Sequence, residues 1–352
     1  MKKINSKWLA LIVAGLLLLT VFAAIFALTS WRAYSAEVMF PQNGTGGEEN
    51  NIPSGQLVEK GRLTVLVAGT DRASGLSDVL MLLSLDRSTG EAWIMQLPRD
   101  TYVHCGKGTY RKLNGAPSAL GGMGEFRNFM AEALGVPIHR YVRLTPDAFQ
   151  QAIDAIGGVE IELEEALNYE DPAQGLSIHL PAGKQTLDGA AAEQFVRFRS
   201  DYVRGDLGRM DAQKIFLAAL FEQLRSDLTP MTVTKLGIAL LGNVETDLSL
   251  QDLMILSEEI TSLQADKVYF LTAPGADVTS TKGASFYVLS APAMNEILWG
   301  RFGGEEQGFD PNKSFLYGKS RDFSEIYEEY APYEVVTATG IEENGLGIQR
   351  KE

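Results

Sequence analysis

One short segment of this sequence, residues 197–213, gathers side chains that could bind an anion. A guanidinium group stays charged in proteins, and its flat fork of donors matches the oxygens of a phosphate. Several such groups held close together repel one another unless carboxylates or a bound pyrophosphate lie between them. The alternative is a lattice of surface salt bridges that binds no ligand. The charged residues of the segment are Arg197, Arg199, Asp201, Arg204, Asp206, Arg209 and Asp211, and Gln213 ends it.

Three short apolar runs predict strands, and a charged residue, either an aspartate or an arginine, lies near one end of each run. Asp71 comes after the first run, Asp78 directly precedes the second, and Arg99 follows the third. A short loop and a hairpin join these runs, so we expect the three side chains at one edge of a sheet. The predicted strands are Leu63–Ala68, Val79–Leu85 and Ala92–Leu97.

The two carboxylates at this edge could hold a divalent cation. A site with only oxygen ligands favours Mg²⁺ or Mn²⁺, which predicts Asp71 and Asp78 as metal ligands. The alternative is that both aspartates cap turns and pair with Arg72 and Arg99.

Bulk composition excludes several other classes of function. The formal net charge is −14, so no broad basic face is available for a nucleic acid. Cys105 is the only cysteine, which excludes an internal disulfide and a thiolate metal cluster. The histidines, at positions 104, 139 and 179, lack metal-ligand spacing, and we interpret them as structural or surface residues.

The N-terminal region predicts a membrane anchor. Residues Trp8–Leu28 form a run of 21 residues without a charge, long enough as a helix to cross a bilayer. Lys2, Lys3 and Lys7 precede the run and predict a cytoplasmic N-terminus, with the rest of the chain outside the cell membrane. The alternative is a signal peptide with a weak cleavage site after Ala36.

Beyond the anchor, helical and strand patterns alternate along the chain. This alternation predicts an α/β fold with a mixed central sheet and helices on both faces. We expect a cytoplasmic tail at 1–7, the transmembrane signal anchor at 8–28, an extracytoplasmic stalk at 29–61 and a catalytic domain at 62–300, with its core at 62–228. Residues 301–352 are acidic and rich in Gly, Glu and Tyr, and we expect a flexible tail there.

The motifs of many common enzymes are missing from the sequence. It contains no phosphate loop of the G-x-x-x-x-G-K type, no G-x-S-x-G elbow and no H-E-x-x-H pair. ATP is scarce outside the cell, so a phosphoanhydride there must arrive within the substrate. An arginine-lined site in that setting suggests a lipid pyrophosphate.

The chain resembles the LytR-CpsA-Psr family of cell-wall glycopolymer ligases over about residues 63–224. Each matching fragment is short, but the set occurs in the family's order. The fragments are Gly69-Thr70-Asp71, Ser77-Asp78 with Met81, Pro98-Arg99-Asp100-Thr101, Lys112-Leu113-Asn114, Gly157-Gly158-Val159, Arg197 with Arg199, and Gly205-Asp206 with Gly208, Arg209 and Gln213.

The resemblance implies a membrane-anchored phosphotransferase. It would move a glycopolymer, of the teichoic acid or capsular type, from a polyprenyl pyrophosphate carrier onto peptidoglycan and release polyprenyl phosphate. By motif position, Asp71 and Asp78 would bind Mg²⁺, and Asp206 would orient arginines or accept the acceptor's proton. Phosphoryl transfer depends mainly on positioning and charge neutralisation, which suits such a residue set. The pyrophosphate would be bound by Arg99, Arg197, Arg199 and Arg209. Gln213 would position the pyrophosphate, and Arg72 would be a further ligand.

Two positions depart from the family's pattern. The family often has arginine where this chain has Leu76, and again where it has Ala212. Losing two positive charges could weaken pyrophosphate binding, and Arg72 or Arg204 could compensate. The alternative function is therefore a non-catalytic module that binds polyprenyl pyrophosphate, or a regulator of cell-wall assembly.

Overall fold

The computed structural model describes residues 61–344 except 72–74, 106–109, 172–175, 201, 228, 241–243, 249, 281–282 and 317–323. All of these residues belong to one compact unit, residues 49–352. No helix among them is long and apolar enough to cross a membrane. The predicted cytoplasmic tail, the anchor at 8–28 and nearly all of the stalk lie outside the described residues, so they stay predictions.

A mixed sheet of seven strands runs through the described unit, as the sequence predicted. Its central strands β1, β2 and β3 are antiparallel neighbours, whereas β6 pairs with β1 and β12 pairs with β3 in parallel. Parallel neighbours require a crossover, and the helices between the strands provide it. In spatial order the strands are β11 (Val244–Thr246), β6 (Arg140–Leu144), β1 (Arg62–Thr70), β2 (Ser77–Asp86), β3 (Glu91–Gln96), β12 (Val268–Thr272) and β15 (Val336–Thr337).

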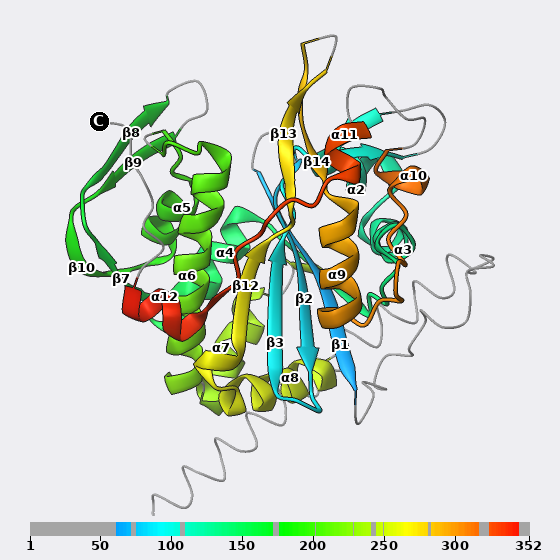
Figure 1. The fold of residues 1–352 in the computed structure, drawn as a ribbon. Coiled ribbons are helices and arrows are strands. Elements are labelled where there is room, and N and C mark those ends of the chain that lie inside the picture. The colour runs from blue at the N-terminus through cyan, green and yellow to red at the C-terminus, as the bar shows by residue number, and fades with distance from the viewer. Residues whose placement is uncertain are drawn as a thin grey trace, which may run out of the picture. The chain divides into compact units, whose positions relative to one another are not determined.

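Helices cover both faces of this sheet (Figure 1). Strand side chains alternate between the faces, so Leu66 and Leu82 pack with α3 and α9 in one core cluster. Phe270 on the other face packs with α6 and α12. The longer helices are α3 (Met123–Leu134), α4 (Pro146–Ile156), α5 (Gly189–Arg197), α6 (Asp206–Asp227), α7 (Pro230–Leu240), α8 (Leu250–Ser262), α9 (Ala291–Arg301) and α12 (Ala338–Asn344).

Beside the sheet, a second core cluster forms where α4, α5 and the first half of α6 meet two β-ribbons. Phe195, Phe198 and Phe216 are its large buried side chains. The strand at 159–163 pairs with β10 in a ribbon and does not join the central sheet. The ribbons are β7 (Val159–Leu163) with β10 (Gly183–Leu187), and β8 (Leu167–Asp171) with β9 (Leu176–Leu180).

Smaller elements complete the unit. Two further hairpins lie near the end of the sheet where β3 finishes: β4 (Tyr102–His104) with β5 (Tyr110–Lys112), and β13 (Gly275–Thr279) with β14 (Ser285–Leu289). A backbone bridge between Thr101 and Tyr287 ties the second hairpin to the segment after Arg99. The short helices are η2 (Leu113–Gly115), α2 (Ala116–Leu120), η3 (Ala265–Lys267), α10 (Pro311–Ser314) and α11 (Ser324–Glu328).

The expectation of a flexible tail from residue 301 is wrong for the part that is described. Phe302, Phe309 and Phe315 are buried in the main core, and Ile341 is buried against α6 and β12. Strand β15 adds to the edge of the central sheet through β12. These apolar residues are too widely spaced to form a periodic pattern, but burying them still stabilises the fold by about 2 kcal/mol each.

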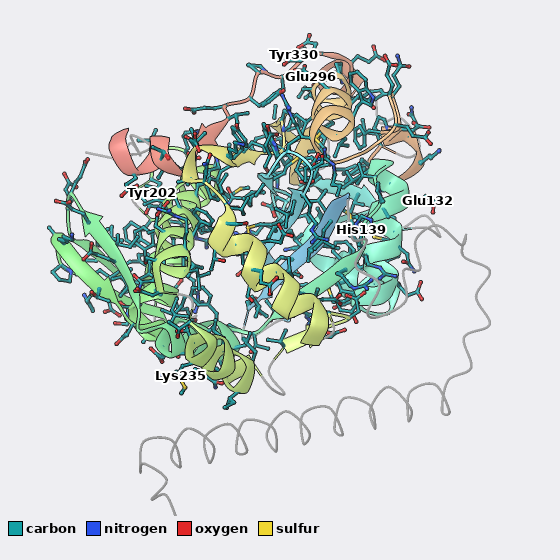
Figure 2. The ribbon with its side chains drawn as sticks, turned by 90° about the horizontal axis from the view of Figure 1, so that it is seen from below. Glu132, His139, Tyr202, Lys235, Glu296 and Tyr330 are labelled. Atoms are coloured by element: carbon teal, nitrogen blue, oxygen red, sulfur yellow. The ribbon has the colours of Figure 1, made fainter. Side chains whose placement is uncertain are left out.

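A buried ion pair connects β6 to α8. Arg140 and Asp252 form a buried pair between β6 and α8, with Nε and Oδ2 3.3 Å apart. The neighbouring His139, labelled in Figure 2, accepts a hydrogen bond at Nδ1 from the backbone N–H of Thr64 on β1 (2.9 Å). Burial, and then the charge of Arg140, lower the pKa of His139. This histidine is structural, as the sequence indicated.

Candidate functional site

A β-bulge places Asp78 beside Arg99 at the end of the central sheet. Gly69 pairs with Val79 and Thr70 pairs with Ser77, so Asp78 between them has no partner residue on β1. Such a bulge redirects a side chain at a sheet edge. The hairpin of β2 and β3 brings Arg99 to the same edge, where its Nη1 lies 2.6 Å from Oδ1 of Asp78. The predicted meeting of these two side chains is confirmed.

The first turns of α6 bring the second half of the site. Gly205 precedes the helix with a φ of 56°, a conformation that favours glycine. Asp206, Arg209 and Gln213 then follow at spacings of three and four residues, which place them on one helix face. Gly208 lies against Tyr202, because a Cβ at Gly208 would come within 2.6 Å of the tyrosine's Cβ. The missing side chain therefore allows the helix to begin close to this loop.

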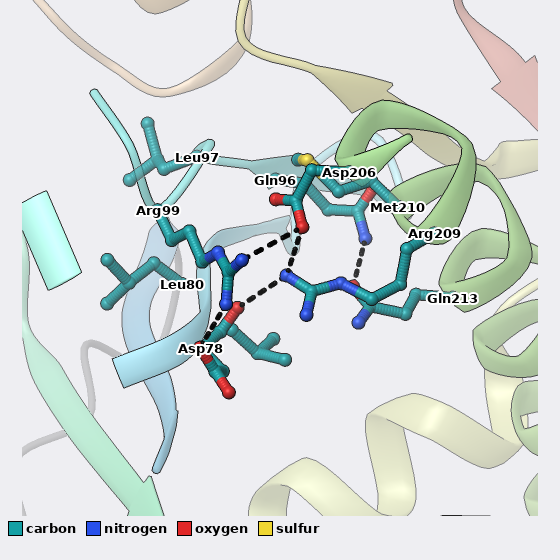
Figure 3. A pocket seen from close by; sticks show the side chains of 10 residues that line it. Asp78, Leu80, Gln96, Leu97, Arg99, Asp206, Arg209, Met210 and Gln213 are labelled. Carbon is teal, nitrogen blue, oxygen red and sulfur yellow. Dashed lines mark hydrogen bonds and ion pairs between the residues drawn. The ribbon is translucent and has the colours of Figure 1, made fainter. Parts of the chain in front are cut away.

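One carboxylate joins the two halves (Figure 3). Oδ1 of Asp206 lies 2.9 Å from Nη2 of Arg209 and 3.5 Å from Nη2 of Arg99. Nη2 of Arg209 also donates to the backbone carbonyl of Asp78 at 3.4 Å. Two guanidinium groups from distant parts of the sequence are thus held close to each other by Asp206, with Asp78 as the second anion.

These side chains line a small pocket at the end of the sheet. The two guanidinium groups and two carboxylates among its lining residues suit a charged group. Its remaining walls come from strand ends and α6. The lining residues are Asp78, Val79, Leu80, Gln96, Leu97, Arg99, Asp206, Arg209, Met210 and Gln213.

The two arginines of the pocket differ in how well their charge is balanced. Burial lowers the pKa of Arg99, but the charges of Asp206 and Asp78 outweigh it, and the net pKa is raised. For Arg209, burial is again the largest influence, and repulsion from Arg99 and Arg199 adds to it. The pKa of Arg209 is therefore lowered despite Asp206. A bound anion would relieve this excess of positive charge.

Unused donors also point to an anion. The Nε atoms of Arg99 and Arg209 are buried and donate no hydrogen bond within the described residues. Buried donors in native proteins are usually paired, because an unpaired donor costs about 1–3 kcal/mol. Phosphate oxygens are acceptors that such donors could use.

Gln213 bridges the pocket floor to the end of α5. Its Oε1 accepts a hydrogen bond from Nε2 of Gln96 on β3 (3.2 Å), and its Nε2 donates to the carbonyl of Val196 (3.0 Å). The glutamine is 7% exposed and both ends of its amide are engaged. It therefore fixes α5, α6 and β3 relative to one another around the pocket.

Other predicted site residues lie further from the pocket. Arg197 pairs with Glu193, with Nη1 and Oε1 2.9 Å apart, and does not line the described pocket. Arg199 does not line it either, although its charge lowers the pKa of Arg209. Oδ1 of Asp71 accepts a hydrogen bond from the N–H of Gly75 (2.8 Å). Arg72 lies outside the described residues.

Asp78 offers one carboxylate oxygen to the predicted metal site. Its Oδ1 contacts Arg99, while its Oδ2 accepts no hydrogen bond from any described residue. Asp71 follows the end of β1, next to the bulge that carries Asp78. The described residues contain no group of three or more His, Cys, Asp or Glu suited to a metal ion. Two carboxylates still fit Mg²⁺, which commonly takes one or two carboxylates together with substrate phosphates.

Sequence reasoning missed an acidic residue near the site. Asp277 on β13 has its pKa raised, first by burial and then by the charges of Asp100 and Asp206. Asp100 itself pairs with Lys112, with Oδ2 and Nζ 3.1 Å apart. Asp277 lies 71 positions beyond Asp206 (277 − 206), and only the folded hairpin brings it near. No local pattern marks it.

The two departures from the family pattern lie outside the pocket, and one of them is in a hydrophobic core. Ala212 is fully buried in the second core cluster, with Phe198, Tyr202 and Phe216 among its members. Leu76 lies beside Gly115, where a Cβ would come within 3.8 Å of its Cδ2. Neither residue is among those lining the described pocket. At position 212, the sequence indicated a lost pocket charge, and the structure places that position in a hydrophobic core.

Comparison with known proteins identifies the family. The model of the LytR_cpsA_psr family matches residues 35–299, which is more than half of the chain. The chain belongs to this family. The predicted resemblance is confirmed, and the matched range contains every residue of the pocket.

Two relatives with assigned names are teichoic acid transferases. The polyisoprenyl-teichoic acid–peptidoglycan teichoic acid transferase TagU of Oceanobacillus iheyensis is 30% identical over 250 residues, covering 68% of this chain and 75% of the relative. The corresponding TagV of Bacillus subtilis is 28% identical over 222 residues, covering 62% of this chain and 56% of the relative. The predicted enzyme class of this LytR_cpsA_psr protein, a transferase, is confirmed.

Solved structures of the family share the fold. The crystal structure of B. subtilis TagV matches with a TM-score of 0.59 and 25% identity, over 68% of this chain and 95% of TagV. TagT bound to LIIa-WTA matches with a TM-score of 0.56 and 26% identity, over 68% of this chain and 88% of TagT. The central mixed sheet with helices is therefore confirmed as this family's architecture.

Position 212 offers a direct test of the packing around α6. Ala212→Arg would bury a guanidinium group among aromatic rings, so we expect a loss of more than about 3 kcal/mol in the free energy of unfolding. Urea denaturation measures it. Ser226→Arg, at an exposed position of the same helix, is the control and should change stability little. Unchanged stability of Ala212→Arg, with stronger pyrophosphate binding, would show that position 212 faces the pocket.

Proposed function

We propose that this LytR_cpsA_psr protein transfers a glycopolymer from a polyprenyl pyrophosphate carrier to peptidoglycan and releases polyprenyl phosphate. The observation that carries the proposal is the convergence of Arg99 and Arg209 on one pocket, with Asp206 between them. The relatives TagU and TagV are named for the transfer of polyisoprenyl-linked teichoic acid to peptidoglycan, which supports the same substrate class. The polymer would be a teichoic acid or a capsular-type polysaccharide.

The proposed reaction is a phosphoryl transfer. A hydroxyl oxygen of the peptidoglycan acceptor attacks the phosphorus that carries the sugar. The bond from that phosphorus to the bridging oxygen breaks, and the bridging oxygen leaves as part of polyprenyl phosphate. The hydroxyl proton passes to a base, and a new phosphodiester joins the polymer to the wall. Charge neutralisation on the leaving phosphate lowers the barrier.

The pocket assigns the main charges in this reaction. Arg99 and Arg209 would bind the pyrophosphate, because both lie in the pocket and both have a buried Nε with no partner in the described residues. Asp206 would orient these two arginines or accept the proton of the acceptor. Gln213, which fixes α6 against β3, would position the same group. Arg197 and Arg199 would add positive charge from outside the pocket. Arg72, which the structure does not describe, would be a further pyrophosphate ligand.

We further propose that Asp71 and Asp78 hold Mg²⁺ or Mn²⁺. The support is the unpaired Oδ2 of Asp78 and the position of Asp71 at the end of the adjacent strand. When bound, the ion would supply positive charge to the pyrophosphate oxygens.

The proposed location is the cell membrane, with one spanning helix at 8–28 and the catalytic unit outside. Its support is the charge-free run in the sequence. Cell fractionation tests this: the full chain should sediment with membranes, and a chain starting at residue 62 should not. Equal distribution of the two chains between the fractions would contradict the anchor.

Arg99→Ala tests the catalytic role of the pocket. Removing one charged donor from a phosphate site should lower turnover by about 100- to 1,000-fold. The measurement is release of polyprenyl phosphate from a lipid-linked oligosaccharide with peptidoglycan as acceptor. Arg225→Ala is the matched control, because Arg225 lies at the other end of α6 and pairs only within that helix. If the wild type binds the lipid but turns over no faster than Arg99→Ala, the protein is a binding module or regulator instead.

Asp78→Asn tests the metal proposal. The amide keeps the shape of the side chain but removes the charge that would bind the ion, so turnover that depends on added Mg²⁺ should disappear. Asp86→Asn, at the opposite end of β2, should retain it, although Asp86 also pairs with an arginine, Arg62, at 2.7 Å. Normal Mg²⁺-dependent turnover in Asp78→Asn would remove the assignment.

A further inference from the structure

A buried carboxylate, Glu193, lies behind Arg197 at the end of α5. The side chain of Glu193 is 10% exposed and that of Arg197 is 30% exposed. They stand four residues apart on the helix, and Oε1 of Glu193 accepts a hydrogen bond from Nη1 of Arg197 at 2.9 Å. A buried carboxylate requires hydrogen-bond or charged partners. Glu193 therefore favours conformations of Arg197 that keep the contact between them.

The second oxygen of Glu193 is also engaged. Oε2 accepts a hydrogen bond from Nε2 of Gln150 on α4 at 2.5 Å. Close packing of the two helices fixes this contact, because a Cβ at Gly189 would meet the backbone carbonyl of Gln150 at 2.3 Å. The hydrogen bond from Gln150 on α4 therefore braces the side chain of Glu193 and restricts its movement.

The contact uses only one end of the guanidinium group. Nη1 of Arg197 points to Glu193, whereas Nε and Nη2 donate no hydrogen bond to any described residue. An arginine held at one amino group presents its remaining donors in a fixed direction, which suits a phosphate oxygen. Breaking a buried pair leaves an uncompensated charge, so Arg197 is not free to swing away from Glu193.

The end of α5 is tied to the pocket by a separate contact. The carbonyl of Val196, one residue before Arg197, accepts a hydrogen bond from the pocket residue Gln213. Arg197 thus follows a residue that contacts the pocket wall, but it is not among the ten residues that line the pocket. Any group it binds would extend beyond the space between Arg99 and Arg209.

We propose that Glu193, braced by Gln150, is a positioning residue that orients Arg197 toward the phosphate of the substrate that lies outside the pocket. This inference rests on the proposed function and deepens it. Arg99 and Arg209 bind one phosphate of the pyrophosphate in the pocket, and Arg197 binds the other phosphate, outside the pocket, through Nε and Nη2. Glu193 touches no substrate and acts only through Arg197.

A double-mutant cycle tests the inference. The probe is farnesyl diphosphate, a short polyprenyl pyrophosphate, and its dissociation constant is measured by calorimetry for the whole chain. Glu193→Gln keeps the size of the side chain but removes its charge, so the guanidinium is held less firmly. We expect about tenfold weaker binding, as for the loss of one charge-assisted hydrogen bond. In an Arg197→Ala background, the same substitution should change the affinity less than twofold.

Two further variants separate positioning from folding. Gln150→Leu removes the brace but leaves the charge pair, and it should weaken binding in the same direction by about two- to threefold. Glu160→Gln is the matched surface control, because its carboxylate pairs with Lys184 at 2.7 Å and is exposed. It should bind like wild type. Thermal melting of each variant reports whether the fold is kept.

The outcomes distinguish this inference from the function it rests on. Unchanged affinity in a folded Glu193→Gln chain, or an equal loss in the Arg197→Ala background, would overturn the positioning role while leaving the pocket assignment in place. If the wild type binds no farnesyl diphosphate, both the proposed function and this inference fail. If Glu193→Gln unfolds, a Gln150→Leu chain with wild-type affinity overturns the inference.

Discussion

The whole site depends on one carboxylate that stands between two arginines. Arg99 reaches the sheet edge on the end of β3, and Arg209 reaches it on the first turns of α6. The two guanidinium groups repel each other, and Asp206 offsets this repulsion. Its Oδ1 lies 3.5 Å from Nη2 of Arg99 and 2.9 Å from Nη2 of Arg209. Asp206 precedes Arg209 by about one helical turn. Helix α6 therefore carries both the second arginine of the pocket and the carboxylate that offsets its charge.

The compensation is incomplete, and this leaves a role for a ligand. Two carboxylates, Asp78 and Asp206, face two arginines, and Arg199 adds a third positive charge whose effect is felt at Arg209. Both pocket arginines also retain a buried Nε with no partner in the described residues. A diphosphate would add acceptors and negative charge at the same place. Stability and substrate binding thus depend on the same residues.

Much of this arrangement could be predicted from the sequence. The short apolar runs predicted β1, β2 and β3 with nearly their observed bounds. The short connections between them were enough to predict that Asp78 lies beside Arg99. The resemblance to the family placed Arg209 and Gln213 in the same site as Arg99. The bulge at Asp78 was not predictable, because its register depends on tertiary contacts along β1.

Other features escaped prediction for a common reason, which is that they arise between segments far apart in the chain. In the sequence, Glu193 has no feature that distinguishes it from other acidic residues on a helix. It is buried only because α4, with Gln150, packs against α5. Ala212 is exposed or buried according to where the β-ribbons lie, which periodicity does not reveal. The residues after 301 lack a regular pattern because Phe302, Phe309 and Phe315 each fill a separate gap in a core formed by other elements.

The most direct test of the account compares two ligands that differ by one phosphate. Calorimetric titration of the whole chain with farnesyl diphosphate and with farnesyl monophosphate measures what the second phosphate contributes. A site built from converging arginines predicts that the diphosphate binds at least about tenfold more tightly, since each charge-assisted hydrogen bond contributes roughly 1.5–3 kcal/mol. Equal affinities for the two ligands would contradict the claim that these arginines form a diphosphate site.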